Sequence, residues 1–494
     1  SLGHRPLVAV RSQGVFVWPE AFRDRDGRDT APWPAASGLA SRRPTPPLRM
    51  TTPDRTPVKV GLLTAASLVV ANMVGTGIFT SVGFQVEYLD SPFALLMLWA
   101  VGGVISLCGA LTYGELGAAL PRSGGEYHLI SELYHPSLGF IAGWISATLG
   151  FAGPTALAAI AFGDYTTAVF PSLSSTHLAA GIVLLCSAIH ATSITWGSWF
   201  QNAFTALKVL LILVFVGAAV RADPTHSITV APSGDGLNEL LSPGFAVSLV
   251  FVSYAYAGWN AAIYIVGEIR DPQRNLPLSL VLGTALVTVL YVLLNFVFLY
   301  TVPAQEMAGE VEVGFLAGSV IFGDAGGEVM SLFIALLLIS TVSALVYLGP
   351  RVTQAMGEDA PALRWLAVTN DRGIPVNSIL FQLGLALLFI YTSTFDQVLV
   401  YAGFTLILST MVTVAGVFVL RWRRPEIDRP YKTWGYPVTP LLFLAANAWI
   451  LVYVFLDRPT ESLIGLGIVA VGAALYFASQ WGAPDEAPVS GHRP

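Results

Sequence analysis

Asn72-Met73-Val74-Gly75-Thr76-Gly77-Ile78-Phe79 lies in the middle of the first long apolar run of the chain, at residues 60–86. Two glycines inside a helix cost roughly 1 kcal/mol each relative to alanine. Small residues there permit close packing of membrane helices, which is one interpretation. The other is a break in the helix, whose exposed N–H groups form a positive end suited to a carboxylate. Non-helical backbone at membrane depth must be buried in protein or line a polar cavity, so a break predicts half of a binding site.

The composition is typical of a membrane protein with many spans. The 494 residues are 54% hydrophobic and 11% charged, and the mean hydropathy is +0.66, which excludes an ordinary soluble protein of this length. The net charge of −6 says little, because the side on which charges fall matters more than their sum. Cys108 and Cys186 lie inside apolar runs, so neither is placed for a disulfide outside the membrane or for a metal site.

The ends of the sequence differ from its apolar middle. Residues 1–57 are rich in Arg and Pro, without apolar periodicity or the apolar core of a signal peptide, and the first methionine is Met50. We expect a disordered tail or, for residues 1–49, an over-extended start. The membrane domain is expected over residues 58–482, followed by a C-terminal tail at 483–494.

A spanning helix needs about 20 apolar residues, and charge decides how many spans the apolar runs make. With the long run 127–169 as one span, 22 of the 25 Lys and Arg residues fall on the side of the N-terminus. Two spans broken at Pro154 would divide them 13 against 11, against the positive-inside tendency. We predict an all-α protein of the plasma (inner) membrane, with twelve spans and both termini in the cytoplasm. The runs are 60–86, 92–119, 127–169, 177–194, 198–220, 243–269, 276–301, 328–351, 375–391, 394–420, 436–456 and 460–480.

The sixth run carries an interruption of its own, Ser253-Tyr254-Ala255-Tyr256-Ala257-Gly258-Trp259-Asn260. It comes five helices after the first interruption, so the two helices enter the membrane from opposite sides. Paired interrupted helices in two inverted halves are the best pointer in a sequence to a transporter binding site.

Several motifs together resemble those of the amino acid–polyamine–organocation transporters, and within them the L-type amino acid transporters. They are Gly75-Thr76-Gly77-Ile78-Phe79, Tyr113-Gly114-Glu115-Leu116, Pro121-Arg122-Ser123-Gly124-Gly125-Glu126-Tyr127, Tyr256-Ala257-Gly258-Trp259-Asn260 and Glu268-Ile269-Arg270-Asp271-Pro272. The resemblance implies a LeuT-type fold of five plus five inverted helices with two more at the C-terminus. The repeats would cover about 58–220 and 243–421, and the extra helices about 436–480.

The resemblance also implies where an amino acid would bind. Its carboxylate would meet N–H groups around Gly75, Thr76 and Gly77, and its ammonium the carbonyls of Met73, Tyr254 and Ala257. The dipole ends of interrupted helices support this division independently. Ile78, Ala255 and Asn260 complete the predicted site.

Three residues of the second interruption have more specific predictions. Tyr254 aligns with an aromatic residue that lies over the substrate as an inner gate, with a plain packing role as the alternative. Ala257 stands where L-type transporters commonly have Gly, which favours smaller neutral substrates. Asn260 either ties the unwound segment to a neighbour or takes part in gating or substrate contact.

Lys208 lies about ten residues from either end of the fifth run, or ~15 Å at 1.5 Å rise per residue, too deep to reach the membrane surface. A buried lysine costs about 3 kcal/mol on insertion and is by default a functional candidate. By resemblance it replaces a sodium ion and bridges the first interruption to hydroxyls of the eighth helix, among Ser340, Thr341 and Ser343. The alternative is a purely structural lysine.

The sequence therefore predicts a sodium-independent secondary transporter of neutral L-amino acids, an exchanger or facilitator working by alternating access, with proton linkage left open. It predicts no enzyme, no cofactor and no metal. By the same resemblance, a cysteine in the loop between the third and fourth helices would link the chain to a heavy chain, as in animal members of the family. The loop at 171–176 has no cysteine, so no disulfide-linked heavy chain is expected. Glu115 and Glu268 are expected to pair with Arg270, Arg274 or Arg122 at the inner gate. The alternatives are an ion-coupled symporter of other amines or cationic amino acids, and an amino acid sensor that does not transport.

Overall fold

The computed structural model describes residues 59–192, 197–219, 221, 228, 230–232, 234–360 and 363–481. The expectations for residues 1–57 and 483–494 fall outside this part of the chain.

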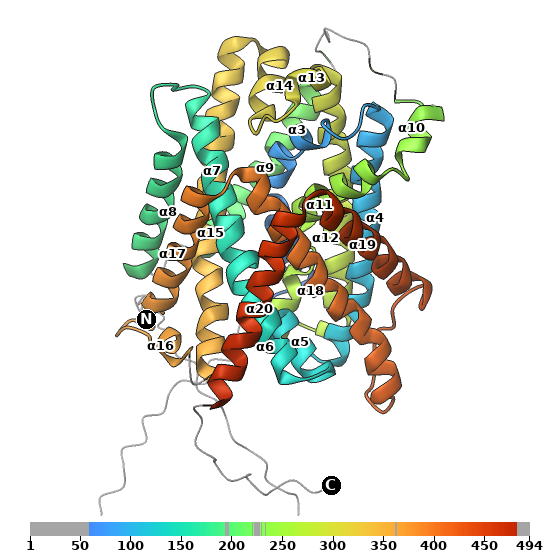
Figure 1. Cartoon of the computed structure of the whole chain (residues 1–494), viewed down its shortest axis with the longest axis vertical. Helices are drawn as coiled ribbons and strands as arrows, with labels where there is room; N and C mark the ends of the chain where they lie inside the picture. The colour runs from blue at the N-terminus through green and yellow to red at the C-terminus, as the bar shows by residue number, and fades with distance from the viewer. Residues whose placement is uncertain are drawn as a thin grey trace, which may run out of the picture. The chain divides into compact units, whose positions relative to one another are not determined.

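The described chain is built from helices, which Figure 1 labels in chain order. The first half comprises α1 (Leu62–Met73), α2 (Gly77–Thr80), α3 (Val82–Gln85), α4 (Pro92–Ala119), α5 (Gly125–Leu133), α6 (Pro136–Ile145), the π-helical η1 (Ser146–Ala152), α7 (Gly153–Thr167), α8 (Ser175–Thr192), α9 (Gly197–Ala219) and α10 (Gly234–Glu239). The second comprises α11 (Pro243–Tyr256), the 3₁₀-helical η2 (Ala261–Glu268), α12 (Pro272–Thr301), α13 (Ala304–Met307), α14 (Val313–Phe322), α15 (Asp324–Asp359), α16 (Arg364–Ala367), α17 (Val376–Thr392), α18 (Phe395–Arg423), α19 (Val438–Asp457) and α20 (Pro459–Trp481).

Within the described residues, ten helical segments are long and apolar enough to cross a membrane. The runs predicted at 198–220 and 375–391 are represented by the shorter apolar helices Phe204–Ala219 and Val376–Thr392. The protein is therefore an all-helical membrane protein with many spans, as predicted.

The prediction for the run 127–169 is wrong at its start. α5 ends at Leu133, and a new helix begins at Pro136, where the His135 side chain accepts a hydrogen bond from the Ser137 N–H. Proline suits the first turn of a helix because its missing N–H has no partner there. From Pro136 to Thr167 the chain is one span of 32 residues. Pro154 does not break it, since it follows the π-helical turns in the first turn of α7.

The two interrupted helices run antiparallel and meet at one face of the bundle. Val60, just before α1, donates to the Glu268 carbonyl at 2.8 Å and accepts from the Arg270 N–H at 2.9 Å, at the end of η2. The chain entering α1 therefore lies beside the chain leaving η2. In Figure 1, α5, α6 and α16 lie at one end of the bundle, and α3, α10, α13 and α14 at the other.

The end that carries α13 and α14 is closed by contacts between distant helices. The buried Tyr165 hydroxyl donates to the Phe79 carbonyl at 2.8 Å and accepts from the Gly314 N–H at 3.1 Å. The Phe84 ring stacks on both Phe251 and Phe395, at centroid distances of 5.7 and 5.9 Å. These contacts join α2 and α3 to α7, α11, α14 and α18.

Glu312, which precedes α14, makes the stability of this end depend on pH. Burial, with smaller contributions from the carboxylates of Asp164 and Glu310, raises the pKa of Glu312 from 4.5 to about 7. The folded protein then holds this proton more tightly than the unfolded chain does. Its stabilising contribution is fully present below pH 4.5 and is lost as the pH rises through 7.

We expect Glu312→Gln to flatten the decrease in thermal stability between pH 5 and pH 8, because glutamine stays neutral throughout. The measurement is the unfolding temperature of the detergent-solubilised protein across that range. Glu306→Gln, at an exposed position of α13, is the matched control and keeps the wild-type slope. An unchanged slope in Glu312→Gln would contradict the assignment.

Candidate functional site

The first interruption separates α1 from α2. α1 ends at Met73, Val74 leaves the helical conformation with ψ of 81°, and the helix resumes only at Gly77. The Gly75 N–H turns back to the Met73 carbonyl at 2.7 Å. The N–H groups at the start of a helix have no partner within it, so those around Thr76 and Gly77 are available to a ligand. The predicted break is therefore confirmed.

The second interruption separates α11 from η2. α11 ends at Tyr256, and Ala257 has an extended backbone with φ of −53° and ψ of 136°. Gly258 has φ of +104°, a conformation that other residues rarely adopt. A Cβ there would also meet the Asn72 backbone at 2.9 Å, so the two interruptions touch.

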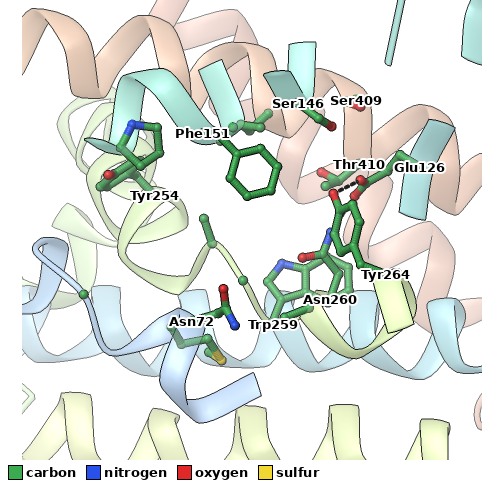
Figure 2. Close-up of a pocket in the computed structure, with 18 of the residues that line it drawn as sticks. Asn72, Glu126, Ser146, Phe151, Tyr254, Trp259, Asn260, Tyr264, Ser409 and Thr410 are labelled. Atoms are coloured by element: carbon green, nitrogen blue, oxygen red, sulfur yellow. Dashed lines mark hydrogen bonds between the residues drawn. The ribbon is translucent and has the colours of Figure 1, made fainter. Parts of the chain in front are cut away.

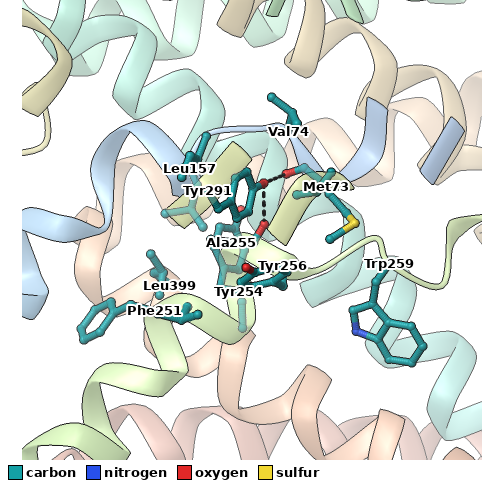
Figure 3. Packing of buried hydrophobic residues seen from close by; sticks show 14 of the residues in the cluster. Met73, Val74, Leu157, Phe251, Tyr254, Ala255, Tyr256, Trp259, Tyr291 and Leu399 are labelled. Atoms are coloured by element: carbon teal, nitrogen blue, oxygen red, sulfur yellow. Dashed lines mark hydrogen bonds between the residues drawn. The ribbon is translucent and has the colours of Figure 1, made fainter. Parts of the chain in front are cut away.

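Tyr291 of α12 joins the two interruptions (Figure 3). Its hydroxyl lies 2.5 Å from the Met73 carbonyl and 3.0 Å from the Ala255 carbonyl, the ends of the two half-helices. The Met73 carbonyl therefore already has two hydrogen-bonding partners, Gly75 N–H and the Tyr291 hydroxyl. The Tyr254 carbonyl accepts from the Ala257 N–H at 2.9 Å, which leaves it a second lone pair.

A cavity of about 470 Å³ lies beside the interruptions, a volume typical of small-molecule sites. Figure 2 shows side chains from several helices around it. Of the predicted site, it is lined by Met73, Gly75, Thr76, Gly77, Tyr254, Ala255, Ala257 and Asn260. Ile78 is fully buried in the hydrophobic core and is not among the lining residues.

The cavity extends toward the face where α1 begins. Its lining there includes Leu68 of α1, Glu268 at the end of η2, and Arg351 and Ala355 near the end of α15. At the opposite end the described helices are held together by the contacts of Tyr165 and Phe84. A site reached from one face and closed at the other is what alternating access requires.

Lys208 of α9 contacts α15, as predicted for the hydroxyls of the eighth run. Its ammonium donates to the Thr341 hydroxyl at 2.8 Å, and the lysine is 3% exposed. Thr341 itself lines the cavity, so Lys208 is one residue removed from it. Ser343 instead contacts the His190 ring at 2.9 Å. The Thr341 hydroxyl therefore links the lysine to the cavity wall.

The predicted partners of Glu115 are wrong. Its fully buried carboxylate accepts two hydrogen bonds from Arg421 of α18, at 2.9 and 2.7 Å, and one from the Thr433 N–H at 2.6 Å. Arg421 also stacks on the Tyr436 ring at 3.6 Å. The end of α18 and the segment after it pack against the end of α4, which places Arg421 and Thr433 at Glu115.

No individual role was predicted for several residues that the fold brings to the cavity. Asn72, Phe151, Tyr264 and Glu126 all line it. Glu126 was visible in the sequence as a carboxylate directly after two glycines, at the start of a helix. Its hydrogen-bonding partners are separated from it by up to 138 residues, and no local pattern reveals them.

Two antiparallel interrupted helices beside a cavity reached from one face are the architecture of a secondary transporter. The comparisons with known proteins agree. A family model described as amino acid permease matches residues 60–477. This chain belongs to that family, and it is an amino acid transporter.

Its relatives include members of the L-type branch. Large neutral amino acids transporter small subunit 2 of Rattus norvegicus is 31% identical over 430 residues, 85% of this chain and 80% of that protein. The b(0,+)-type amino acid transporter 1 of Homo sapiens is 29% identical over 431 residues, which cover 85% of this chain and 87% of that protein. The Asc-type amino acid transporter 1 of Mus musculus is 27% identical over 432 residues, which cover 85% of this chain and 80% of that protein.

Proposed function

We propose that this protein is a sodium-independent exchanger or facilitator of small neutral L-amino acids. The observation that carries the proposal is the pair of interrupted helices whose ends line one cavity. The start of α2 offers N–H groups to the substrate carboxylate, and the Tyr254 carbonyl near the end of α11, which keeps a second lone pair, is offered to its ammonium. A zwitterion satisfies both ends at once.

The charges of the cavity favour a neutral substrate side chain. The buried carboxylate in its wall, Glu126, already accepts hydrogen bonds from Tyr113, Tyr264 and Asn260. Glu268 lies at the far end of η2, away from the interruptions. A cationic side chain would therefore find no unengaged carboxylate close to the breaks among the described residues. The methyl group of Ala257 reduces the space for a large side chain.

The lysine supports independence from sodium. The Lys208 ammonium places a positive charge beside Thr341 of α15. A sodium ion placed beside this charge would be repelled, so the lysine takes the place of a coupling ion. In the plasma (inner) membrane, the face with the start of α1 would be cytoplasmic, because most of the Lys and Arg residues lie on that side.

The test is counterflow into proteoliposomes that contain the purified protein and are preloaded with unlabelled amino acids. We expect uptake of labelled L-alanine or L-serine to be stimulated by internal neutral amino acids and to be equal in sodium and choline buffers. Stimulation by internal lysine alone, or an absolute need for sodium, would overturn the proposal. Saturable binding without any counterflow would instead identify a sensor. A parallel series with an imposed pH gradient decides whether protons are coupled.

We expect Lys208→Met to lower counterflow about tenfold without destabilising the fold. A hydrogen bond from a charged group is worth roughly 1.5–3 kcal/mol, and tenfold corresponds to about 1.4 kcal/mol. Removing the buried charge also removes its desolvation cost, so stability is kept or raised. The measurements are initial uptake rates and thermal unfolding. Leu207→Met, one residue earlier, is the matched control with wild-type uptake. A destabilised but fully active Lys208→Met would assign the lysine a structural role.

A further inference from the structure

Glu126 is a buried carboxylate with donors on several sides. It lies in the first turn of α5 and is 4% exposed. The Tyr113 hydroxyl of α4 donates to its Oε1 at 3.0 Å, and the Tyr264 hydroxyl of η2 donates to its Oε2. The third donor is the Asn260 amide nitrogen, 2.5 Å from Oε1. None of the ion pairs found among the described residues includes Glu126.

The backbone before Glu126 is shaped for this contact. Gly124 and Gly125 have φ of +137° and +59°, which glycine adopts readily. A Cβ at Gly125 would collide with the Tyr264 ring. The two glycines therefore let α5 start directly against η2, with the carboxylate beside the second interruption.

The contact fixes which atom Asn260 turns to the cavity. The Asn260 amide faces Glu126 with its nitrogen, which donates to the carboxylate oxygen Oε1. The amide oxygen then lies on the other side, as Figure 2 shows. Asn260 lines the cavity, so the atom it offers a ligand there is an acceptor.

The side-chain amide of Asn72, at the first interruption, is oriented in the same way as that of Asn260. Its amide nitrogen donates to the Leu68 carbonyl at 2.9 Å, one turn earlier in α1, which leaves the oxygen for the cavity. Both asparagines therefore present acceptors. The Met73 carbonyl nearby is already engaged twice, by Gly75 and Tyr291. A donor group of the ligand will find the amide oxygens more accessible than this carbonyl.

We propose that Glu126 is a positioning residue for substrate recognition, which holds the Asn260 amide so that its oxygen accepts a hydrogen bond from an N–H or O–H group of the substrate. The inference rests on the proposed function and adds a determinant to its site. The donor is either the ammonium, common to all amino acids, or a side-chain hydroxyl.

The decisive experiment is an exchange of hydrogen-bonding roles between the two residues. In Glu126→Gln the new amide group has hydrogens that need an acceptor, and Asn260 can supply one by rotating its oxygen away from the cavity. In Asn260→Asp two carboxylates face each other and repel. The double variant Glu126→Gln/Asn260→Asp restores a donor opposite an acceptor, with the second Asp oxygen on the cavity side.

We expect Glu126→Gln to raise the KM of counterflow about tenfold, Asn260→Asp to abolish counterflow, and the double variant to recover a KM within about threefold of wild type. Equal increases for L-alanine and L-serine identify the ammonium as the donor, and an increase for L-serine alone identifies the hydroxyl. Tyr113→Phe removes another hydrogen bond from the same carboxylate without changing the Asn260 contact. It should destabilise the protein more than it changes KM.

Two outcomes separate this inference from the proposed function. Wild-type KM in Glu126→Gln, or a double variant no better than Asn260→Asp, would overturn the positioning role while leaving amino acid transport intact. If the wild-type protein shows no counterflow, the dissociation constants of L-alanine and L-serine, measured by calorimetry on the same variants, take the place of KM. Equal constants in wild type and Glu126→Gln, or no binding by wild type, would overturn the inference as well.

Discussion

We expect Glu115→Gln to lower the free energy of unfolding by about 3 kcal/mol, because removal of one partner leaves the other charge of a buried ion pair uncompensated. The Glu115 carboxylate joins α4 to Arg421 of α18 and to the Thr433 N–H in the segment that follows. The amide of glutamine has one oxygen and one NH2 group, so at least one of the three hydrogen bonds is lost. The measurement is unfolding of the detergent-solubilised protein by titrated denaturant.

Glu132→Gln is the matched control for this prediction. Glu132 also pairs with an arginine at the end of α18, Arg424, the residue that follows the helix, but at 3.3 Å and with both side chains about 40% exposed. Such pairs contribute roughly 0–1 kcal/mol. Similar effects of the two substitutions would show that burial of the Glu115 pair has no special importance for stability.

We expect Gly77→Ala to lower the ratio of the maximal counterflow rate to KM about thirtyfold. A Cβ at Gly77 would lie 2.7 Å from both Cα and Cβ of Ala255, so α2 and α11 must move apart. The start of α2 would then be displaced from the carboxylate, and contacts of this kind are worth up to about 2 kcal/mol. Thirtyfold corresponds to that energy. Initial counterflow rates over a range of substrate concentrations give the ratio.

The control for Gly77 is Gly181→Ala in α8, where a Cβ has no atom within 4 Å. It should transport as wild type does. A fully active Gly77→Ala would mean that the first interruption tolerates displacement, and the proposed carboxylate site would have to lie elsewhere. Thermal unfolding of the purified Gly77→Ala variant distinguishes a specific loss of transport from a general loss of stability.

The glycines and the apolar runs predicted the helices and their two interruptions well. Most runs coincide with helices because a span must satisfy its own backbone hydrogen bonds in lipid, which is a local requirement. The break at Gly75 and Gly77 was predictable as well, because the effect of glycine on a helix is also local. The start of the third run was missed, because Leu133, Tyr134 and Pro136 read as one apolar segment although the chain turns there.

The contacts of the site were less predictable. The family resemblance predicted that Lys208 faces a hydroxyl among Ser340, Thr341 and Ser343, and the structure shows Thr341. Composition alone gives no register between α9 and α15. Glu115 was assigned to Arg122, Arg270 or Arg274 at the same end of the helices, but its partner, Arg421, lies 306 positions away. Ile78 was predicted to belong to the site because it follows Gly77 in the sequence, but its side chain is buried in the core.

The sequence by itself determined that the chain lies in a membrane, where its helices run, and where two of them break. These properties depend on hydropathy and on glycine, which act within a few residues. Only the tertiary structure decided that the breaks share a cavity and that the Asn260 amide in its wall is hydrogen-bonded to Glu126. The reason is that a buried polar atom takes its role from whichever donor or acceptor folding brings opposite it, and that partner can come from anywhere in the chain.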